Sequence, residues 1–271
     1  MVDFLGIGVP RAGTTWLYHH LVRHPQIAFP GGKEVHFWDR ADLGEAASWL
    51  AGLEPPKRST PAGQPIRCGE ITPTYARLPA ERIAAIRALC PDLRLFVSFR
   101  NPLERAYSAA MADLARSGRP VADVPDQWFV DHFRSEVSRA DGDYVSILDR
   151  WGAAFSADQF FHFISDEIEA CPVGMLEALA DHLQVDPGGF GPLSPTDLAE
   201  RIVPPSADGA AAGQMQDLVP RPSLVPVLQE IYATPVEQFS RRLGRDLKRW
   251  VGGFGAPRVG GPLPRRERAL T

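Results

Sequence analysis

The sequence contains few cysteines, no long apolar run and no surplus of basic residues. Its three cysteines, Cys68, Cys90 and Cys171, lack the spacing of a metal site, which favours a reducing environment in which they pack as small apolar groups. No apolar run approaches the roughly 20 residues of a membrane span or has the form of a signal peptide. The formal net charge of −4 argues against a nucleic-acid partner. We therefore expect a soluble, cytoplasmic protein.

Alternating apolar and helical patterns predict an α/β fold. The predicted strands are 3–9, 66–71, 93–99 and 159–164, and the predicted helices are 14–23, 79–89, 102–117, 143–154 and 172–184. Strands separated by helices indicate βαβ units, so we expect a single domain with a central, mostly parallel sheet flanked by helices. Ligands of such sheets bind outside the carboxyl ends of the strands, which predicts that the loops at 9–14, 71–75 and 100–102 share one edge.

Two segments lack the periodicity of the rest. Residues 204–226 are rich in proline, alanine and glycine, which is typical of a mobile lid. Residues 252–271 are rich in glycine, proline and arginine. We expect a domain over 1–251 followed by a flexible tail over 252–271.

The stretch GIGVPRAGTTWLYHHLVRHP, residues 6–25, joins the first predicted strand to a helix through a tight loop. Gly8 and Gly13 have the spacing of a Walker A phosphate loop, but Thr14 stands where that motif has its lysine. Thr14 and Thr15 offer hydroxyl and amide groups at a helix N-terminus, and Arg11 supplies a cation. The pattern favours an anion site, although a tight turn capped by threonine also fits it.

A second motif, RLFVSFRNPLERAYSAAM at 94–111, follows another predicted strand. Arg100 stands at the end of that strand, Asn101 is a good N-cap, and Pro102 suits the first position of a helix. Ser108 lies about two turns into that helix. Arg100 and Ser108 can bind one further phosphate by charge and hydroxyl group. The alternatives are that Arg100 pairs with a nearby carboxylate and that Ser108 has no ligand.

Both motifs resemble those of sulfotransferases that use 3′-phosphoadenosine 5′-phosphosulfate (PAPS). The similarity extends to KEVHFWD (33–39), GEITPTY (69–75), GDYVSILDRW (142–151) and LGRDLKRW (243–250). KEVHFWD is similar to the branch that includes the heparan sulfate sulfotransferases and their bacterial relatives. The resemblance implies a P-loop-like sulfotransferase fold, PAPS as the sulfuryl donor, and no metal.

The resemblance also assigns the donor's groups to individual residues. The residues implied for the 5′-phosphosulfate are Arg11, Ala12, Gly13, Thr14, Thr15 and Trp16. Those implied for the 3′-phosphate are Arg100 and Ser108. The resemblance thus implies a P-loop relative that moves a sulfuryl group and needs no metal, with Arg11 as the cation of its loop.

The segment 33–39 carries the candidate catalytic groups. Glu34 and His36 are two residues apart, so in an extended segment they face the same way. Sulfuryl transfer to an alcohol needs a positioned base for the acceptor proton, and Glu34 is the candidate. Arg11 stabilises the charge that develops on the leaving phosphate. His36 can orient Glu34 or bind the sulfuryl group, and Asp39 can hold His36. The resemblance agrees, because these three residues match the family's catalytic glutamate, histidine and aspartate.

The sequence departs from its relatives in ways that bear on the acceptor. Arg11 replaces the usual lysine of the loop, and arginine can stabilise charge but cannot donate a proton. Ile71 stands where the heparan sulfate enzymes have a lysine, and the segment 204–226 offers only Arg221 in place of a late basic loop. These changes favour a small-molecule or lipid-like acceptor with a hydroxyl group, or less favourably an amine, over a polyanionic chain.

Two other functions fit parts of the pattern. A P-loop kinase or NTPase needs a lysine at Thr14 and a Mg²⁺-binding aspartate, for which Asp166 is the candidate. A catalytically silent nucleotide-binding module is the other alternative, although the Glu34–His36 pair argues against it.

Overall fold

The computed structural model describes residues 2–53, 60, 63–194, 198, 220–252 and 254. They divide into two compact units. Unit 1 takes its described residues from Met1–Phe99 and Asp149–Ile202, and unit 2 from Arg100–Leu148 and Val203–Arg258. Most of the predicted lid and nearly all of the predicted tail lie outside the described residues, so both stay predictions.

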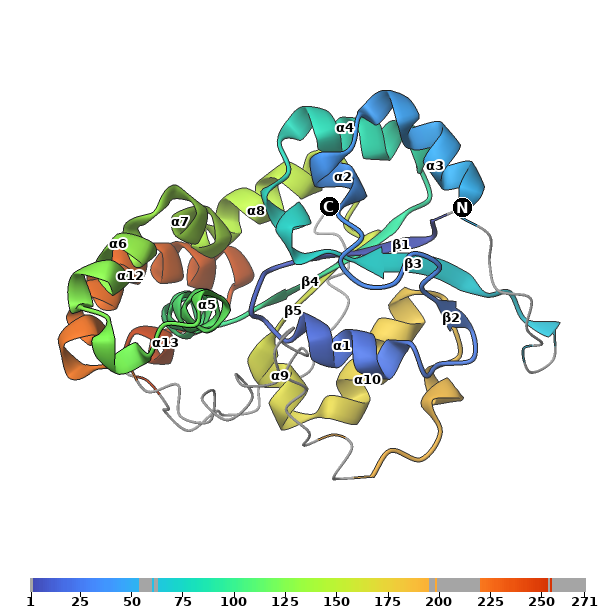
Figure 1. The fold of residues 1–271 in the computed structure, drawn as a ribbon. Helices are drawn as coiled ribbons and strands as arrows, with labels where there is room; N and C mark the ends of the chain where they lie inside the picture. The colour runs from blue at the N-terminus through green and yellow to red at the C-terminus, as the bar shows by residue number, and fades with distance from the viewer. Residues whose placement is uncertain are drawn as a thin grey trace. The chain divides into compact units, whose positions relative to one another are not determined.

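Unit 1 contains a sheet of five strands in the order β2-β3-β1-β4-β5 (Figure 1). The strands are β1 (Phe4–Gly8), β2 (Ile27–Ala28), β3 (Arg67–Ile71), β4 (Arg94–Phe99) and β5 (Phe160–Ile164). Every strand pairing is parallel, and Phe4 of β1 lies beside Gly69 of β3 and Arg94 of β4. The carboxyl ends of β1, β3 and β4 therefore share one edge, as predicted.

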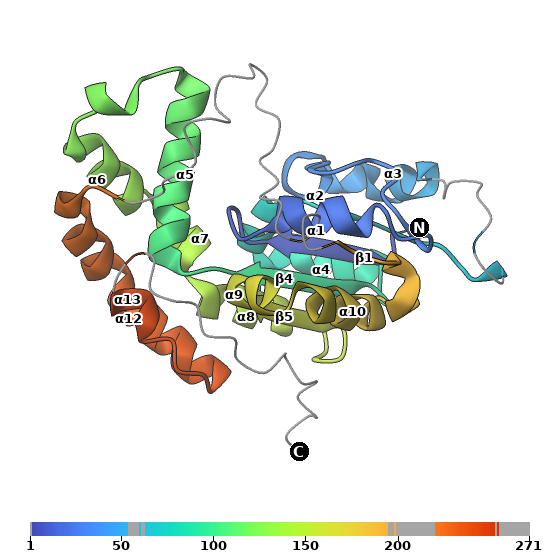
Figure 2. The same cartoon turned by 90° about the horizontal axis from the view of Figure 1, so that it is seen from below.

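Helices cover both faces of this sheet. Helices α1 (Thr14–Leu21), α9 (Ser165–Ala170) and α10 (Pro172–His182) lie on one face, and α4 (Ala80–Leu89) lies on the other (Figures 1 and 2). The short helix α2 (Phe37–Arg40) packs against α4 and is followed by α3 (Ala46–Gly52). Each strand contributes a buried side chain to the apolar cluster under α1 and α10; these are Phe4, Ile27, Ile71, Phe96 and Phe163.

Unit 2 is helical. Its helices are α5 (Pro102–Ser117), α6 (Asp126–Arg134), α7 (Glu136–Gly142), α12 (Val225–Leu243) and α13 (Arg249–Gly252), and it shares α8 (Tyr144–Gly152) with unit 1. The Asn101 side chain accepts from the backbone N–H of Leu103 at 3.0 Å, which confirms the predicted N-cap of α5. Buried apolar side chains from α5, α6 and α12 form the core of the unit.

The four predicted strands and five predicted helices are all present, with ends that differ by at most two residues. The short elements β2, α2, α3 and α9 were missed, as were α6, α7 and α12. Cys68 and Cys90 are buried as expected, but Cys171 is exposed, so the packing role predicted for it is wrong. In the described part of the chain, no helix combines the length and hydrophobicity that crossing a bilayer requires.

Candidate functional site

The loop after β1 has the backbone geometry of an anion cradle. Gly8 has a φ of +142°, and a Cβ atom there would lie 2.6 Å from the carbonyl oxygen of Pro73. Gly13 has a φ of +87° and directly precedes α1. The Ser98 hydroxyl of β4 donates to the Ala12 carbonyl at 2.6 Å, which fixes the loop to the sheet. The predicted loop therefore exists, and glycine is required at both of its ends.

The groups around this loop fit a phosphosulfate. Thr14 and Thr15 begin α1, whose first amides have no partner within the helix and whose dipole favours an anion. Arg11 lies in the same loop with a φ of +70°. Trp16 is buried in the core of unit 1, where its indole N–H donates to the Leu198 carbonyl at 3.3 Å. Because the Trp16 side chain is buried and engaged, the contact with the donor that was predicted for Trp16 would be made by its backbone.

Backbone strain in the described residues concentrates at the predicted site. Among them, four residues other than glycine have a positive φ; they are Arg11, Glu34, His36 and Gln184. Such conformations cost about 1–3 kcal/mol each and cluster at functional sites. Glu34 and His36, at +61° and +59°, flank Val35 and directly precede α2, so the chain does not run extended here; residues Glu34–His36 are called the turn below. The extended conformation expected for 33–39 is wrong, and the alternation argument for the two side chains fails with it.

Glu34 is accessible and has a basic neighbour. Its side chain is 49% exposed, and the Lys33 ammonium donates to Glu34 Oε1. Lys33, which is only 14% exposed, was quoted in the motif but was not predicted as a site residue. An accessible carboxylate beside a cation can accept a proton from a hydroxyl group brought to it.

His36, Asp39 and Thr74 form a hydrogen-bonded group. His36 Nδ1 lies 2.9 Å from Asp39 Oδ2, which confirms that Asp39 holds His36. The Thr74 hydroxyl donates to the same oxygen at 2.6 Å and lies 3.3 Å from His36 Nδ1. Because a carboxylate only accepts, Nδ1 carries the proton, and a neutral His36 offers Nε2 as an acceptor.

The residues that follow β3 hold the turn by its backbone. The Glu34 N–H donates to the Ile71 carbonyl at 3.0 Å. The His36 N–H donates to the Thr72 hydroxyl at 3.4 Å, and the Trp38 N–H donates to the Tyr75 hydroxyl at 3.2 Å. Sequence reasoning missed Thr72 and Thr74 as partners of the turn, although the predicted shared edge of the strands could have indicated them.

Glu70 is the buried ionisable group behind this turn. It is 2% exposed and accepts from the Tyr75 hydroxyl at 2.9 Å and from the Thr72 hydroxyl at 3.0 Å. Burial raises the pKa of Glu70 to about 7, and the negative charge of Asp39 adds to the effect. Burial likewise raises the pKa of Tyr75, whose hydroxyl stays protonated.

Arg82, on α4, is a further residue that sequence reasoning missed. Its Nη1 donates to the carbonyl oxygens of Trp38, at 2.8 Å, and Ala41, at 3.2 Å. These are carbonyls at the end of the short helix α2. The guanidinium thereby stabilises the C-terminal side of the segment that carries Glu34, His36 and Asp39.

Arg100 and Ser108 belong to unit 2. The Arg100 guanidinium makes an ion pair with Glu104, with its Nε at 3.2 Å and its Nη2 at 3.0 Å from Oε2. This is the carboxylate pairing that the sequence left open. Ser108 is buried on α5. Their assignment to a 3′-phosphate stays a prediction.

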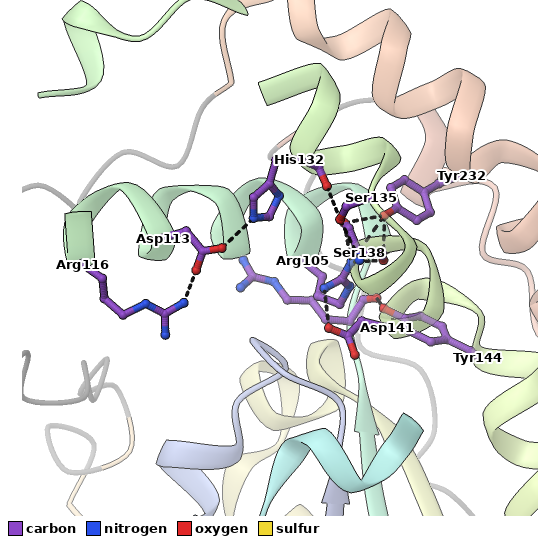
Figure 3. Close-up of polar contacts among 10 residues, drawn as sticks. Arg105, Asp113, Arg116, His132, Ser135, Ser138, Asp141, Tyr144 and Tyr232 are labelled. Carbon is purple, nitrogen blue, oxygen red and sulfur yellow. Dashed lines mark hydrogen bonds and ion pairs between the residues drawn. The ribbon is translucent and has the colours of Figure 1, made fainter. Parts of the chain in front are cut away.

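A buried arginine, also missed from the sequence, organises unit 2 (Figure 3). Arg105 is fully buried on α5, and its Nη2 donates to the Ser138 carbonyl of α7 at 2.7 Å. Its Nη1 lies 3.7 Å from Asp141 Oδ2, and the Tyr232 hydroxyl of α12 lies 3.4 Å from its Nη2. The nearby Tyr144 hydroxyl donates to the Arg100 carbonyl at 2.6 Å. One cation thus links three helices of the unit.

A parallel α/β sheet with a glycine-bounded anion loop after β1 defines a P-loop-like fold. The sulfotransferase from Alicyclobacillus acidocaldarius has this architecture, with a TM-score of 0.62 and 20% identity over 92% of this chain and 98% of that one. A model of the sulfotransferase family matches residues 36–187, which is more than half of the chain. The protein therefore belongs to the sulfotransferase family.

Curated relatives carry more specific names. Human heparan sulfate glucosamine 3-O-sulfotransferase 6 is 29% identical over 258 residues, which cover 89% of this chain and 71% of that protein. The bifunctional heparan sulfate N-deacetylase/N-sulfotransferase 1 of Caenorhabditis briggsae is 26% identical over 202 residues, 68% of this chain and 22% of that protein. Both names describe sulfuryl transfer, and they differ in the group that is sulfated.

Proposed function

We propose that this protein transfers the sulfuryl group of PAPS to a hydroxyl group of an acceptor, with Glu34 as the general base. The observation that carries the proposal is that the strained backbone positions fall on the residues predicted to carry out the reaction. In this member of the sulfotransferase family, four described residues other than glycine have a positive φ, and three of them are Arg11, Glu34 and His36. Family membership also favours sulfuryl transfer over the kinase or NTPase alternative.

The residues of the first loop would bind the donor. PAPS supplies the sulfuryl group and a phosphate leaving group. The amides at the start of α1, with the Thr14 and Thr15 hydroxyls, would hold its 5′-phosphosulfate. Arg11 would stabilise the charge that gathers on the phosphate oxygen as its bond to sulfur breaks.

Glu34 would act at the acceptor. Its carboxylate would accept the proton of the acceptor hydroxyl as the acceptor oxygen forms its bond to sulfur, and adenosine 3′,5′-bisphosphate would leave. Charge balances, because the proton stays on Glu34 and the negative charge leaves with the phosphate. His36, held by Asp39 and Thr74, would bind the sulfuryl oxygens or replace Glu34 as base.

Two positions favour an acceptor with little negative charge. Ile71, where the heparan sulfate enzymes have a lysine, is fully buried in the core of unit 1. Arg221 is engaged within unit 2, where it pairs with Asp126 at 2.6 Å and donates to the carbonyls of Val121 and Val124. Neither position therefore supplies a cation to a sulfated chain. We propose a small-molecule or lipid-like alcohol, with an amine as the less favoured acceptor.

Turnover of labelled PAPS against a panel of alcohols, phenols, amines, lipids and heparan sulfate tests the proposal. We expect transfer to at least one hydroxyl acceptor, with the same rate in the presence of EDTA. Loss of activity in EDTA would contradict the metal-free mechanism. PAPS binding without transfer to any acceptor would indicate the silent module instead.

A further inference from the structure

The strained turn at Glu34–His36 is held through its backbone N–H groups, whose acceptors all come from one segment of the chain. Three N–H groups in and just after the turn, those of Glu34, His36 and Trp38, donate to Ile71 at the end of β3, to Thr72, and to Tyr75 of η3 (Pro73–Arg77). Two of the acceptors are hydroxyl groups, those of Thr72 and Tyr75. Because a hydroxyl that accepts from an N–H still has its own proton to donate, each of them needs a further acceptor.

Glu70 supplies that acceptor to both hydroxyls. The Thr72 hydroxyl donates to Glu70 Oε2 at 3.0 Å, and the Tyr75 hydroxyl donates to Oε1 at 2.9 Å. The backbone of Val35 lowers the pKa of this carboxylate. One buried carboxylate therefore ends two hydrogen-bond chains, which begin at the backbone N–H groups of His36 and Trp38.

We propose that Glu70 is the positioning residue of this site: through Thr72 and Tyr75, its carboxylate holds the turn that carries Glu34 in its strained conformation. The inference rests on the proposed function, because it takes the role of the turn to be the positioning of Glu34 as the general base. Glu70 is 2% exposed, so it acts through the turn and not on a substrate. Strain of this kind persists only where the surroundings impose it.

The ionised form of Glu70 is the one that holds the turn. A carboxylate can accept from both hydroxyl groups, whereas a protonated carboxyl carries a proton of its own that conflicts with one of these donors. Burial raises the pKa of Glu70 to about 7, so the network changes near neutral pH. The groups that act on Glu70 are Tyr75 of η3 and Asp39 of α2, and His36 is bound to Asp39.

The direct test follows the backbone amides of the turn by NMR in the full chain without substrate. We expect the amide signals of Val35, His36 and Trp38 to titrate with a common midpoint near 7. In Glu70→Gln this titration disappears. Because the His36 imidazole can also gain a proton, the titration is repeated with His36→Gln, where the Val35 and Trp38 signals still move. Amides that do not respond to pH in the unmodified protein overturn the proposal.

Kinetics provide the second test. A glutamine at 70 offers one acceptor oxygen and places an NH2 group against a donor, so the turn shifts. Misplacement of a catalytic group by about 1 Å can cost about 10²-fold in rate, so we expect kcat in Glu70→Gln to fall by that order. The affinity for adenosine 3′,5′-bisphosphate stays within about twofold, since the loop after β1 is untouched. An unchanged kcat overturns the proposal.

Control variants separate positioning from general damage. Glu167→Gln removes another buried carboxylate of unit 1, whose Oε2 accepts from the Ile164 N–H at 2.9 Å, and it leaves the amides of the turn unchanged. Thr72→Val removes only the hydroxyl that links the His36 N–H to Glu70, so it should lower kcat less than Glu70→Gln does. An equal or larger loss of kcat in Thr72→Val would contradict the central role of Glu70. If no acceptor is ever sulfated, the proposed function fails, while the amide titration still decides the role of Glu70.

Discussion

At the scale of single residues, the site contains features that lower the free energy of unfolding but fix the position of its side chains. Glu34 and His36 adopt a left-handed backbone conformation without being glycine, and Glu70 is a carboxyl group kept away from water. Each feature costs free energy of folding. Each also helps to fix the position of the exposed Glu34 carboxylate at the edge of the sheet that carries the loop after β1. A general base has to be positioned in this way.

The substitution Glu34→Gln tests the base. Glutamine keeps the shape and the hydrogen-bonding reach of glutamate but cannot accept the acceptor's proton. We expect the single-turnover rate with bound PAPS and acceptor to fall by about 10²–10⁴-fold. The affinity for PAPS stays unchanged, because the base faces the acceptor. The control is Glu45→Gln on the exposed helix η1 (Leu43–Glu45), which keeps full activity. Full turnover in Glu34→Gln would transfer the role to His36.

The buried Glu70 predicts a pH dependence of stability. Its pKa rises from 4.5 to about 7 on folding, so the fold favours the protonated form. The stabilisation is complete below pH 4.5 and is lost as the pH rises through 7. Relative to Glu70→Gln, the unmodified protein should lose about 2–3 kcal/mol of unfolding free energy between pH 5 and pH 8. Urea unfolding at both pH values measures this. Parallel pH curves for the two proteins would refute it.

At the scale of elements, strand ends and helix starts carry the site. The sheet places the ends of β1 and β3 on one edge, so the loop with Arg11 and the segment with Thr72 and Thr74 follow neighbouring strands. Helix α2 then carries Asp39 back to His36 within one turn. In unit 2, Arg100 lies just before the N-cap of α5, and the buried Arg105 lies within that helix.

Arg105 is expected to stabilise unit 2 strongly. Removing one partner of a buried ion pair leaves the other charge uncompensated, at a cost of about 3–5 kcal/mol. Arg105→Ala should therefore lower the unfolding free energy by about that amount in urea titrations, because Asp141 remains buried. The double variant Arg105→Met, Asp141→Asn removes both charges and should lose clearly less. Equal losses in the two variants would show that the charge of Asp141 is not the cause.

Arg100 is expected to bind the 3′-phosphate of the donor. Hydrogen bonds to charged groups contribute about 1.5–3 kcal/mol, so Arg100→Ala should weaken calorimetric binding of adenosine 3′,5′-bisphosphate by about that much. Binding of a nucleotide without the 3′-phosphate should hardly change. Arg116→Ala, which alters an exposed arginine on α5, the helix that follows Arg100, is the matched control. Equal losses for both nucleotides would contradict the assignment.

At the scale of the whole molecule, charge bears on the acceptor. The net charge is −4, Ile71 is a core residue, and Arg221 is engaged by Asp126. None of these features attracts a polyanion, and repulsion between like charges is strongest at low ionic strength. The relatives named for heparan sulfate therefore do not decide the acceptor of this protein.

We expect uncharged alcohols to be sulfated faster than heparan sulfate. For an uncharged acceptor, kcat/KM should change little between about 0.05 and 0.2 M salt, because no charge on the acceptor is screened. Initial rates with labelled PAPS measure both comparisons. Heparan sulfate turned over faster than every uncharged alcohol, with a rate that falls steeply as salt is added, would show a basic acceptor site instead.

The sequence by itself determined the fold class, the principal strands and helices and the sulfotransferase motifs. Local patterns carry these features: apolar runs mark the buried strands, and the glycine spacing and the Asn101–Pro102 pair mark where α1 and α5 begin. The shared edge of the strand ends also followed, because parallel pairing places carboxyl ends together. The pairing of Asp39 with His36 could be predicted because the two residues lie three positions apart.

Only the tertiary structure decided how the segment with the proposed base, Glu34, is held. The turn at Glu34–His36 is strained, and its conformation is imposed by Thr72, Tyr75 and Glu70, which are about 35 residues away in the sequence. Local propensity favours an extended chain there and gives no sign of this. The raised pKa of Glu70 and the burial of Arg105 also depend on what the fold places around them, because desolvation is set by neighbours distant in sequence.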